Sequence, residues 1–242
     1  EKLYGDKDRE PNVVDGVDEI RDEKDMEHFL FDFEKKANTV EDMDEYDKKM
    51  GEQYEEQMSE LSKEERQQVK EDAESWKQLG GYEAIQDAIE SGEISEQDII
   101  DRNERMSNRA HETVTKVEQP IERGITIPND SVDEFMERFV EGEVAEIPDE
   151  SGHGSSGFSI NGEVARGFSN VSDDDPEQTS IVMRIEPNSN GEVRGLYIDG
   201  EPDTDYEEGE ILRSSKSEAK VMTVETKKLP SGKIIKIITL QE

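Results

Sequence analysis

Acidic side chains dominate this sequence, and they limit both its core and the partners it can bind. The chain has 64 Asp and Glu against 29 Lys and Arg, a formal net charge of −35, and 30% of its 242 residues are hydrophobic. Typical globular domains are about 45–50% apolar, so we expect a core that is thin or confined to part of the chain. Nucleic-acid affinity depends on Lys and Arg that neutralise phosphates. The charge therefore excludes a general nucleic-acid binder and disfavours an anionic membrane surface.

The acidity is spread along the whole chain. Residues 1–58 hold 21 acidic and 9 basic side chains, and residues 59–242 hold 43 and 20. An acidic tail that seeks a partner would concentrate the charge in one segment. A hydrated anionic surface, which keeps a protein soluble at high salt, would spread it. We therefore predict a halophilic protein from a salt-rich interior.

Residue types that are missing or rare exclude several kinds of site. The chain has no cysteine, which excludes disulfides, thiolate metal sites and iron–sulfur clusters. The three histidines are distant in sequence and match no ligand motif, so no metal site is predicted. The longest apolar stretch, residues 234–240, is far shorter than the ~20 residues that span a bilayer. No N-terminal signal pattern is visible.

The pattern of apolar residues divides the chain at about residue 60. Residues 1–18 show no periodicity and are expected to form a loop or a disordered lead. The stretch 18–57 is polar on every face, apart from one short stripe at helical spacing: Met26, Phe29, Leu30 and Phe33. We therefore predict an acidic, partly helical or disordered extension over 1–59 and a folded domain over 60–242.

The domain begins with helices and continues with strands. Residues 60–118 are predicted to be helical, because Ser62 opens a capping box and Ser95 begins a further helix. A short helix is predicted from Ser131. The predicted strands alternate apolar and polar residues and are 121–127, 158–160, 181–185, 195–198, 210–212, 219–224 and 234–240. Helices followed by a set of short strands indicate the α+β class.

Two motif matches fail when their context is considered. Residues 152–157 match the Gly-x-Gly-x-x-Gly dinucleotide fingerprint, but a β-like segment follows where a helix should begin. The acidic segment from Asp203 resembles a calcium loop, but its glycine is at position seven and Ser214 stands at position twelve. The alternative that this chain is a calcium-binding acidic protein therefore rests on its charge alone.

Three separated pieces of sequence are more informative when taken in order. Arg123 lies in a predicted strand, and Ser159 precedes a Val-Ala-x-x-Phe segment. Glu208 and Glu210 then lead directly into Ile-Leu. Two residues at i and i+2 at the start of a strand point to the same face. Two carboxylates so placed gain by binding a cation or a hydroxyl-rich ligand.

This order resembles the arginine-specific mono-ADP-ribosyltransferases of bacterial exoenzymes and phages. The similarity extends upstream, where residues 80–86 resemble the helical Tyr-x-x-Ile-Asn segment of that family, and it spans residues 60–242. It implies a helical N-terminal lobe followed by two small, mostly antiparallel sheets around an NAD cleft. It also implies transfer of ADP-ribose from NAD to an arginine of a target protein, with release of nicotinamide and without a metal.

The resemblance assigns a role to each matched residue. Arg123 would hold the NAD diphosphate, with Gly124 beside it in the cofactor site. Glu210 would bind the nicotinamide ribose and stabilise the positive charge that develops as nicotinamide leaves. Ser159 would buttress Glu210, and Glu208 would orient or deprotonate the acceptor guanidinium.

Two further residues are assigned to the NAD site. Ser156 stands one residue too early for the first serine of the family's Ser-Thr-Ser strand and could serve only with a local bulge. Phe168 is expected in the core behind the nicotinamide pocket. The alternative function is a non-catalytic structural or adaptor module, for example a phage head-assembly component with virion proteins as partners. The expected location is cytoplasmic or virion-associated, with a secreted toxin as a further alternative.

Overall fold

The computed structural model describes residues 13–14, 16–22, 24–26, 29, 43–78, 91–92, 94–148, 155–171, 175–198 and 209–242. Its helices include α2 (Met43–Ser59), α3 (Lys63–Gln78), α5 (Glu96–Glu112), the 3-10 turn η1 (Asn129–Ser131), α6 (Val132–Met136) and α7 (Gly162–Ser169). The strands are β1 (Val13–Val14), β2 (Val17–Glu19), β3 (Val114–Lys116), β4 (Ile121–Pro128), β5 (Val144–Glu146), β6 (Ser155–Ser159), β7 (Gln178–Glu186), β8 (Glu192–Arg194), β9 (Leu196–Tyr197), β10 (Glu210–Ser214), β11 (Glu218–Lys228) and β12 (Ile234–Gln241).

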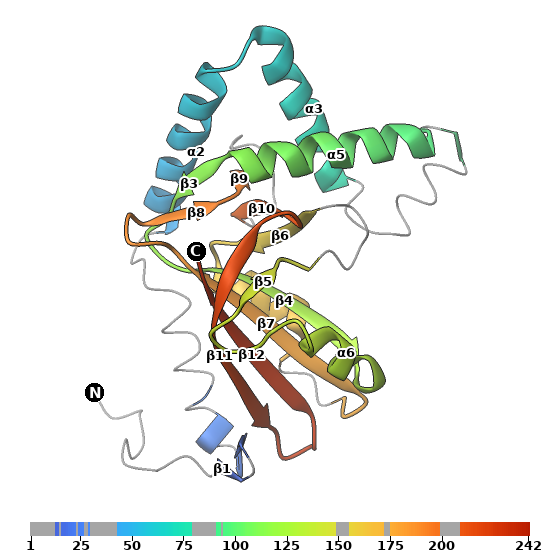
Figure 1. Ribbon diagram of the computed structural model, residues 1–242, viewed down its shortest axis with the longest axis vertical. Coiled ribbons are helices and arrows are strands. Elements are labelled where there is room, and N and C mark those ends of the chain that lie inside the picture. The colour runs from blue at the N-terminus through green and yellow to red at the C-terminus, as the bar shows by residue number, and fades with distance from the viewer. Residues whose placement is uncertain are drawn as a thin grey trace.

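Helices α2, α3 and α5 lie together at one end of the molecule, and α5 crosses the ends of several strands (Figure 1). The expected capping box at Ser62 and the expected helix cap at Ser95 are both confirmed. The Ser95 side chain accepts from the backbone N–H of Asp98, and the Ser62 hydroxyl accepts from Glu65 N–H at 3.2 Å. Helix α5 is fixed to the sheet through its buried face, where the hydroxyls of Ser107 and Ser214 lie 2.7 Å apart.

Helix α2 has a buried stripe that the sequence reading missed. Tyr46, Met50, Tyr54 and Met58 recur every four residues, are at most 3% exposed, and belong to the main core cluster. The expectation that this stretch is polar on every face is therefore wrong. Strand β2, which pairs in parallel with β11, likewise replaces the loop expected over the first residues. The domain boundary at residue 60 stays a prediction.

The strands form one large sheet rather than two small ones. Among the described residues, the large sheet has ten strands. Nine follow the order β1-β2-β11-β12-β7-β4-β6-β10-β9, and the tenth, β5, pairs with β11; β3 and β8 form a separate two-stranded sheet. Most pairs are antiparallel, as expected; β2–β11 and β7–β12 are parallel. The large sheet has a narrow point, because β4 and β6 share the single register pair Glu122–Ser159. The α+β class is confirmed, and the two small sheets are corrected to one sheet with a one-pair seam between β4 and β6.

A buried ion pair lies at this seam. Glu122, 1% exposed, accepts a hydrogen bond from Arg184 Nε at 2.5 Å, and Arg184 is 6% exposed. Burial raises the pKa of Glu122, and the Arg184 guanidinium opposes that effect. Helix α7 packs on the adjacent part of β4, where a Cβ atom on Gly124 would lie 1.7 Å from the Ala165 carbonyl oxygen. Only glycine permits this close approach of helix and strand.

Candidate functional site

Arg123 and Glu210 meet at Gly157 in the middle of β6. Strand β6 lies between β4, which carries Arg123, and β10, which begins at Glu210. Arg123 Nη1 donates to the Gly157 carbonyl oxygen at 3.0 Å. Glu210 Oε1 lies where a side chain at Gly157 would be, 2.0 Å from the position of an added Cβ atom. Two residues that are 87 positions apart in sequence therefore converge on one backbone unit, and all three residues are half-buried.

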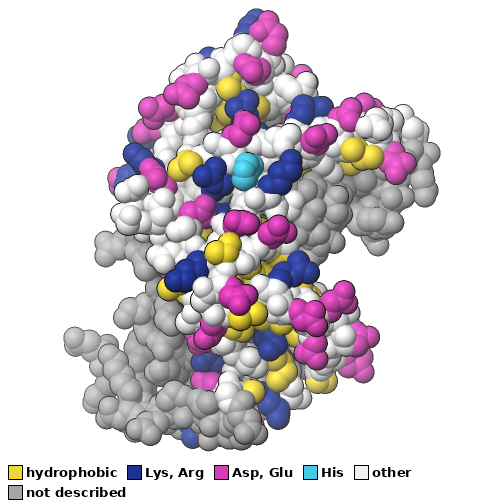
Figure 2. Space-filling model, in the orientation of Figure 1, with side chains coloured by type: hydrophobic (Ala, Val, Ile, Leu, Met, Phe, Trp, Pro, Cys, Tyr) yellow, Lys and Arg dark blue, Asp and Glu magenta, His cyan; other side chains and the backbone are white. Residues whose placement is uncertain are grey.

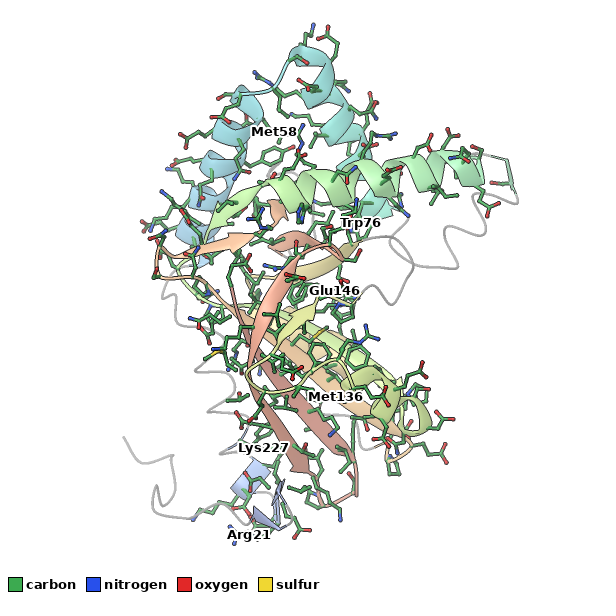
Figure 3. The ribbon with its side chains drawn as sticks, in the orientation of Figure 1. Arg21, Met58, Trp76, Met136, Glu146 and Lys227 are labelled. Carbon is green, nitrogen blue, oxygen red and sulfur yellow. The ribbon has the colours of Figure 1, made fainter. Side chains whose placement is uncertain are left out.

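Glu210 is also held from the helical end of the molecule. The indole Nε1 of Trp76 donates to Glu210 Oε1 at 3.2 Å. Trp76 lies near the end of α3, below α5 and close to the ends of β6 and β10 (Figure 3). The guanidinium carbon of Arg102 lies 5.8 Å from the centroid of the Trp76 ring. Sequence reasoning missed this contact, because Trp76 fitted the apolar stripe of a helix.

Ser159 is paired with both neighbours of β6. It lies opposite Glu210 on β10 and opposite Glu122 on β4. Its hydroxyl accepts a hydrogen bond from the backbone N–H of Asn161 at 2.8 Å and so helps to turn the chain into α7. Residues opposite one another in an antiparallel pair share a face, so Ser159 and Glu210 lie on the same face of the sheet.

Ser156 does not belong to this group, which corrects its assignment. The register between β6 and β10 is unbroken from residue 155 to 159, so the local bulge that Ser156 requires is absent from this strand pair. Alternation along the strand places Ser156 on the face opposite Ser159. Its hydroxyl instead donates to the Pro148 carbonyl oxygen at 2.6 Å.

Phe168 lies outside the core, which corrects its expected position. Its side chain is 61% exposed on α7, a helix whose buried residues are Gly162, Ala165 and Ser169. Gly124 contacts α7 rather than the open side of the site. A place for either residue in NAD binding stays a prediction.

Glu208 lies outside the described residues, as do residues 80–86. The expectation that Glu208 shares a face with Glu210 therefore stays a prediction. Among the described residues, β10 begins at Glu210, and Gly209 has a left-handed backbone with φ of +57°. A Cβ atom on Gly209 would also lie 2.3 Å from Ile160 Cγ1. Gly209 thus permits a sharp entry into β10 directly before Glu210.

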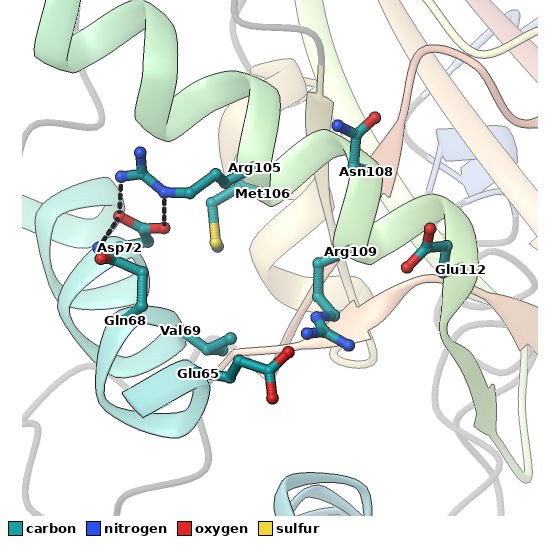
Figure 4. Close-up of a pocket in the computed structure, with 9 residues that line it drawn as sticks. All are labelled: Glu65, Gln68, Val69, Asp72, Arg105, Met106, Asn108, Arg109 and Glu112. Carbon is teal, nitrogen blue, oxygen red and sulfur yellow. Dashed lines mark hydrogen bonds and ion pairs between the residues drawn. The ribbon is translucent and has the colours of Figure 1, made fainter. Parts of the chain in front are cut away.

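A separate pocket lies between α3 and α5 (Figure 4). Val69 and Met106 contribute apolar lining, and Asp72 forms a two-point ion pair with Arg105 at 2.7 and 2.8 Å. Neither Arg123 nor Glu210 lines this pocket. The pocket is therefore distinct from the cluster around Gly157.

The charges on the surface agree with the acidic composition of the sequence. Asp and Glu side chains are scattered over both the helical end and the sheet on the face that Figure 2 shows, with Lys and Arg between them. Within the described part of the chain, no three His, Asp or Glu side chains gather in a way that could hold a metal ion. No described helix is long and apolar enough to cross a membrane.

The fold is similar to that of a solved ADP-ribosyltransferase. The structure of the ADP-ribosyltransferase Vis with the M6 inhibitor superposes with a TM-score of 0.54, is 17% identical, and is matched over 87% of this chain and 89% of that chain. Vis toxin from Vibrio splendidus, in a second structure, gives 0.49 at 16% identity over 91% and 86%. An ADP-ribosyltransferase from Clostridium botulinum gives 0.49 at 16% identity over 85% and 98%. No protein-family model and no curated protein matches the sequence, so the likeness is one of fold.

Proposed function

We propose that this chain transfers ADP-ribose from NAD to an arginine of a target protein and releases nicotinamide. The observation that carries the proposal is the convergence of Arg123 and Glu210 on Gly157. It occurs in a chain with the fold of the ADP-ribosyltransferase Vis. Arg123, Ser159 and Glu210 come from separate strands, as the sequence resemblance requires.

The side chains of Arg123 and Glu210 have the chemistry that binding of NAD requires. A guanidinium offers paired donors that match the oxygens of a diphosphate, and Arg123 is half-buried, so its charge is partly shielded from water. Gly157 lacks a side chain at the point where Glu210 lies, which keeps the carboxylate close to the strand that Arg123 contacts. Arg123 would bind the diphosphate, and Glu210 would bind the nicotinamide ribose.

Glu210 supplies the chemistry of the first half of the reaction. When NAD is bound, its nicotinamide is the leaving group and its ribose develops positive charge, as in glycoside cleavage. A fixed carboxylate beside that ribose stabilises the charge in the transition state. Ser159 lies opposite Glu210 in the β6–β10 pair, on the same face, and from there it would support the carboxylate.

The acceptor half is assigned to Glu208 from the sequence. A guanidinium is charged at all ordinary pH values and must lose a proton as it attacks. A carboxylate next to the acceptor can orient it and accept that proton. Arginine is therefore the acceptor that two closely spaced glutamates favour.

Labelled NAD, incubated with the protein and a small alkylguanidine acceptor, tests the proposal. We expect label on the acceptor and release of nicotinamide, and we expect Glu210→Gln to lose both. Glu134→Gln, at an exposed position on α6, is the matched control and should behave as wild type. Absence of both products with the wild-type protein would refute the enzyme and leave a non-catalytic module.

A further inference from the structure

One oxygen of the Glu210 carboxylate lies close to both Gly157 and Trp76. Its Oε1 atom lies over Gly157 and also accepts the hydrogen bond from Trp76 Nε1 at 3.2 Å. A hydrogen bond to a charged carboxylate favours its ionised form and fixes its orientation. The contact joins α3 to the first residue of β10, across 134 positions of sequence.

Trp76 is itself fixed by a buried cation. Arg102 is 3% exposed, and its guanidinium carbon lies 5.8 Å from the Trp76 ring centroid. The guanidinium donates to the Ser75 carbonyl and hydroxyl at 3.0 and 2.9 Å and to Asn103 Oδ1 at 2.8 and 3.0 Å. These hydrogen bonds keep the Arg102 guanidinium close to the Trp76 ring. A cation near an indole attracts the π electrons of the ring and thereby makes its N–H group a stronger donor.

We propose that Trp76 is a positioning residue for Glu210, and that Arg102 holds Trp76 in place. This inference rests on the proposed function. In this arrangement Glu210 acts on NAD, while Trp76 holds its carboxylate over Gly157. The helical end of the molecule thereby controls the reactive carboxylate, although it lies outside the strands that carry Arg123, Ser159 and Glu210.

The first test separates positioning from binding. Trp76→Phe keeps an aromatic ring in the α3–α5 packing and removes only the N–H donor. We expect kcat for nicotinamide release to fall about tenfold, as for loss of one hydrogen bond to a charged group, with the KM for NAD unchanged within about twofold. Wild-type kcat in a folded Trp76→Phe protein overturns the inference, whereas an inactive wild type overturns the proposed function.

The second test needs no activity. Trp76 is the only tryptophan in the chain, so tryptophan fluorescence reports on the surroundings of this side chain. We expect the emission of the wild-type protein without NAD to change at roughly pH 3–6, where carboxylates titrate, and the change to be absent in Glu210→Gln. Arginine side chains in general stay charged in this range. Asp72 lies one helical turn before Trp76, so Asp72→Asn serves as the control and should keep the transition.

The two fluorescence outcomes decide the contact in solution. A transition that depends on Glu210 and persists in Asp72→Asn supports the inference. A transition that is unchanged in Glu210→Gln shows that Trp76 does not contact this carboxylate and overturns it. Because Trp76 is not altered in this experiment, a folding defect of Trp76→Phe cannot mask the result.

Discussion

Replacement of Gly157 by alanine tests the geometry of the site with a single methyl group. The added Cβ atom would lie 2.0 Å from Glu210 Oε1 and 2.9 Å from Glu210 Cδ, below the 3.0 Å that Cβ contacts require. The carboxylate must therefore withdraw by about 1 Å. A displacement of that size at a catalytic group can cost about 100-fold in rate. We expect kcat for nicotinamide release in Gly157→Ala to fall by about that factor.

The stability of this variant should change much less than its activity. The clash involves the end of a flexible, half-buried side chain, which can swing aside. Loss of a buried hydrogen bond to a charged group destabilises a fold by about 1.5–3 kcal/mol. Loss of the bond from Trp76 to the half-buried Glu210 should cost less. Replacing glycine by alanine within a strand stabilises the fold by about 0.5–1 kcal/mol. The free energy of unfolding should therefore change by less than about 2 kcal/mol, which denaturant titration can measure.

Gly167→Ala is the matched control, because a Cβ atom at Gly167 meets no atom within 4 Å. It should retain wild-type kcat. If Gly157→Ala also retains wild-type kcat, Glu210 does not act from the position over Gly157, and the site must be rebuilt around another conformation of β10.

Three further predictions follow from the charges of the chain. Glu122→Gln should destabilise the fold by about 3–5 kcal/mol, because it leaves Arg184 buried without this carboxylate. In denaturant titrations, the double variant with Arg184→Met should recover most of that loss. An equal loss of stability in the single and the double variant would argue against the ion pair. The melting temperature should rise with KCl up to molar concentration, because salt screens the self-repulsion of a net charge of −35. The Debye length shortens from ~30 Å at 0.01 M salt to ~3 Å at 1 M. A melting temperature that does not change with KCl would contradict the halophilic interpretation. Glu208→Gln should abolish modification of arginine and keep hydrolysis of NAD, whereas Glu210→Gln should abolish both; wild-type transfer by Glu208→Gln would contradict the assigned role.

Local patterns in the sequence were sufficient for the longer elements. The caps at Ser62 and Ser95, and the alternation over 121–127, 181–185 and 234–240, predicted helices and strands that the structure contains. Strands β3, β5 and β8 were missed because each has three residues, too few to show alternation. The stripe of α2 was missed because its apolar residues are separated by three polar or charged ones at almost every turn.

The site itself could be predicted only in part, because its details depend on register and packing. The order of Arg123, Ser159 and Glu210 was readable in the sequence, and the structure brings all three to adjacent strands. The face of Ser156 depends on the β6–β10 register, and the exposure of Phe168 depends on how α7 is rotated on β4. No local pattern could indicate the bond from Trp76 to a residue 134 positions away.

The one-pair seam between β4 and β6 lies between the two parts of the candidate site. Arg123 belongs to the β4 side of this seam, and Glu210 belongs to the β6–β10 side. The pair Glu122–Ser159, which closes the seam, is one residue from Arg123 and directly opposite Glu210. A change in the strand pairing across this seam would therefore move Arg123 relative to Glu210.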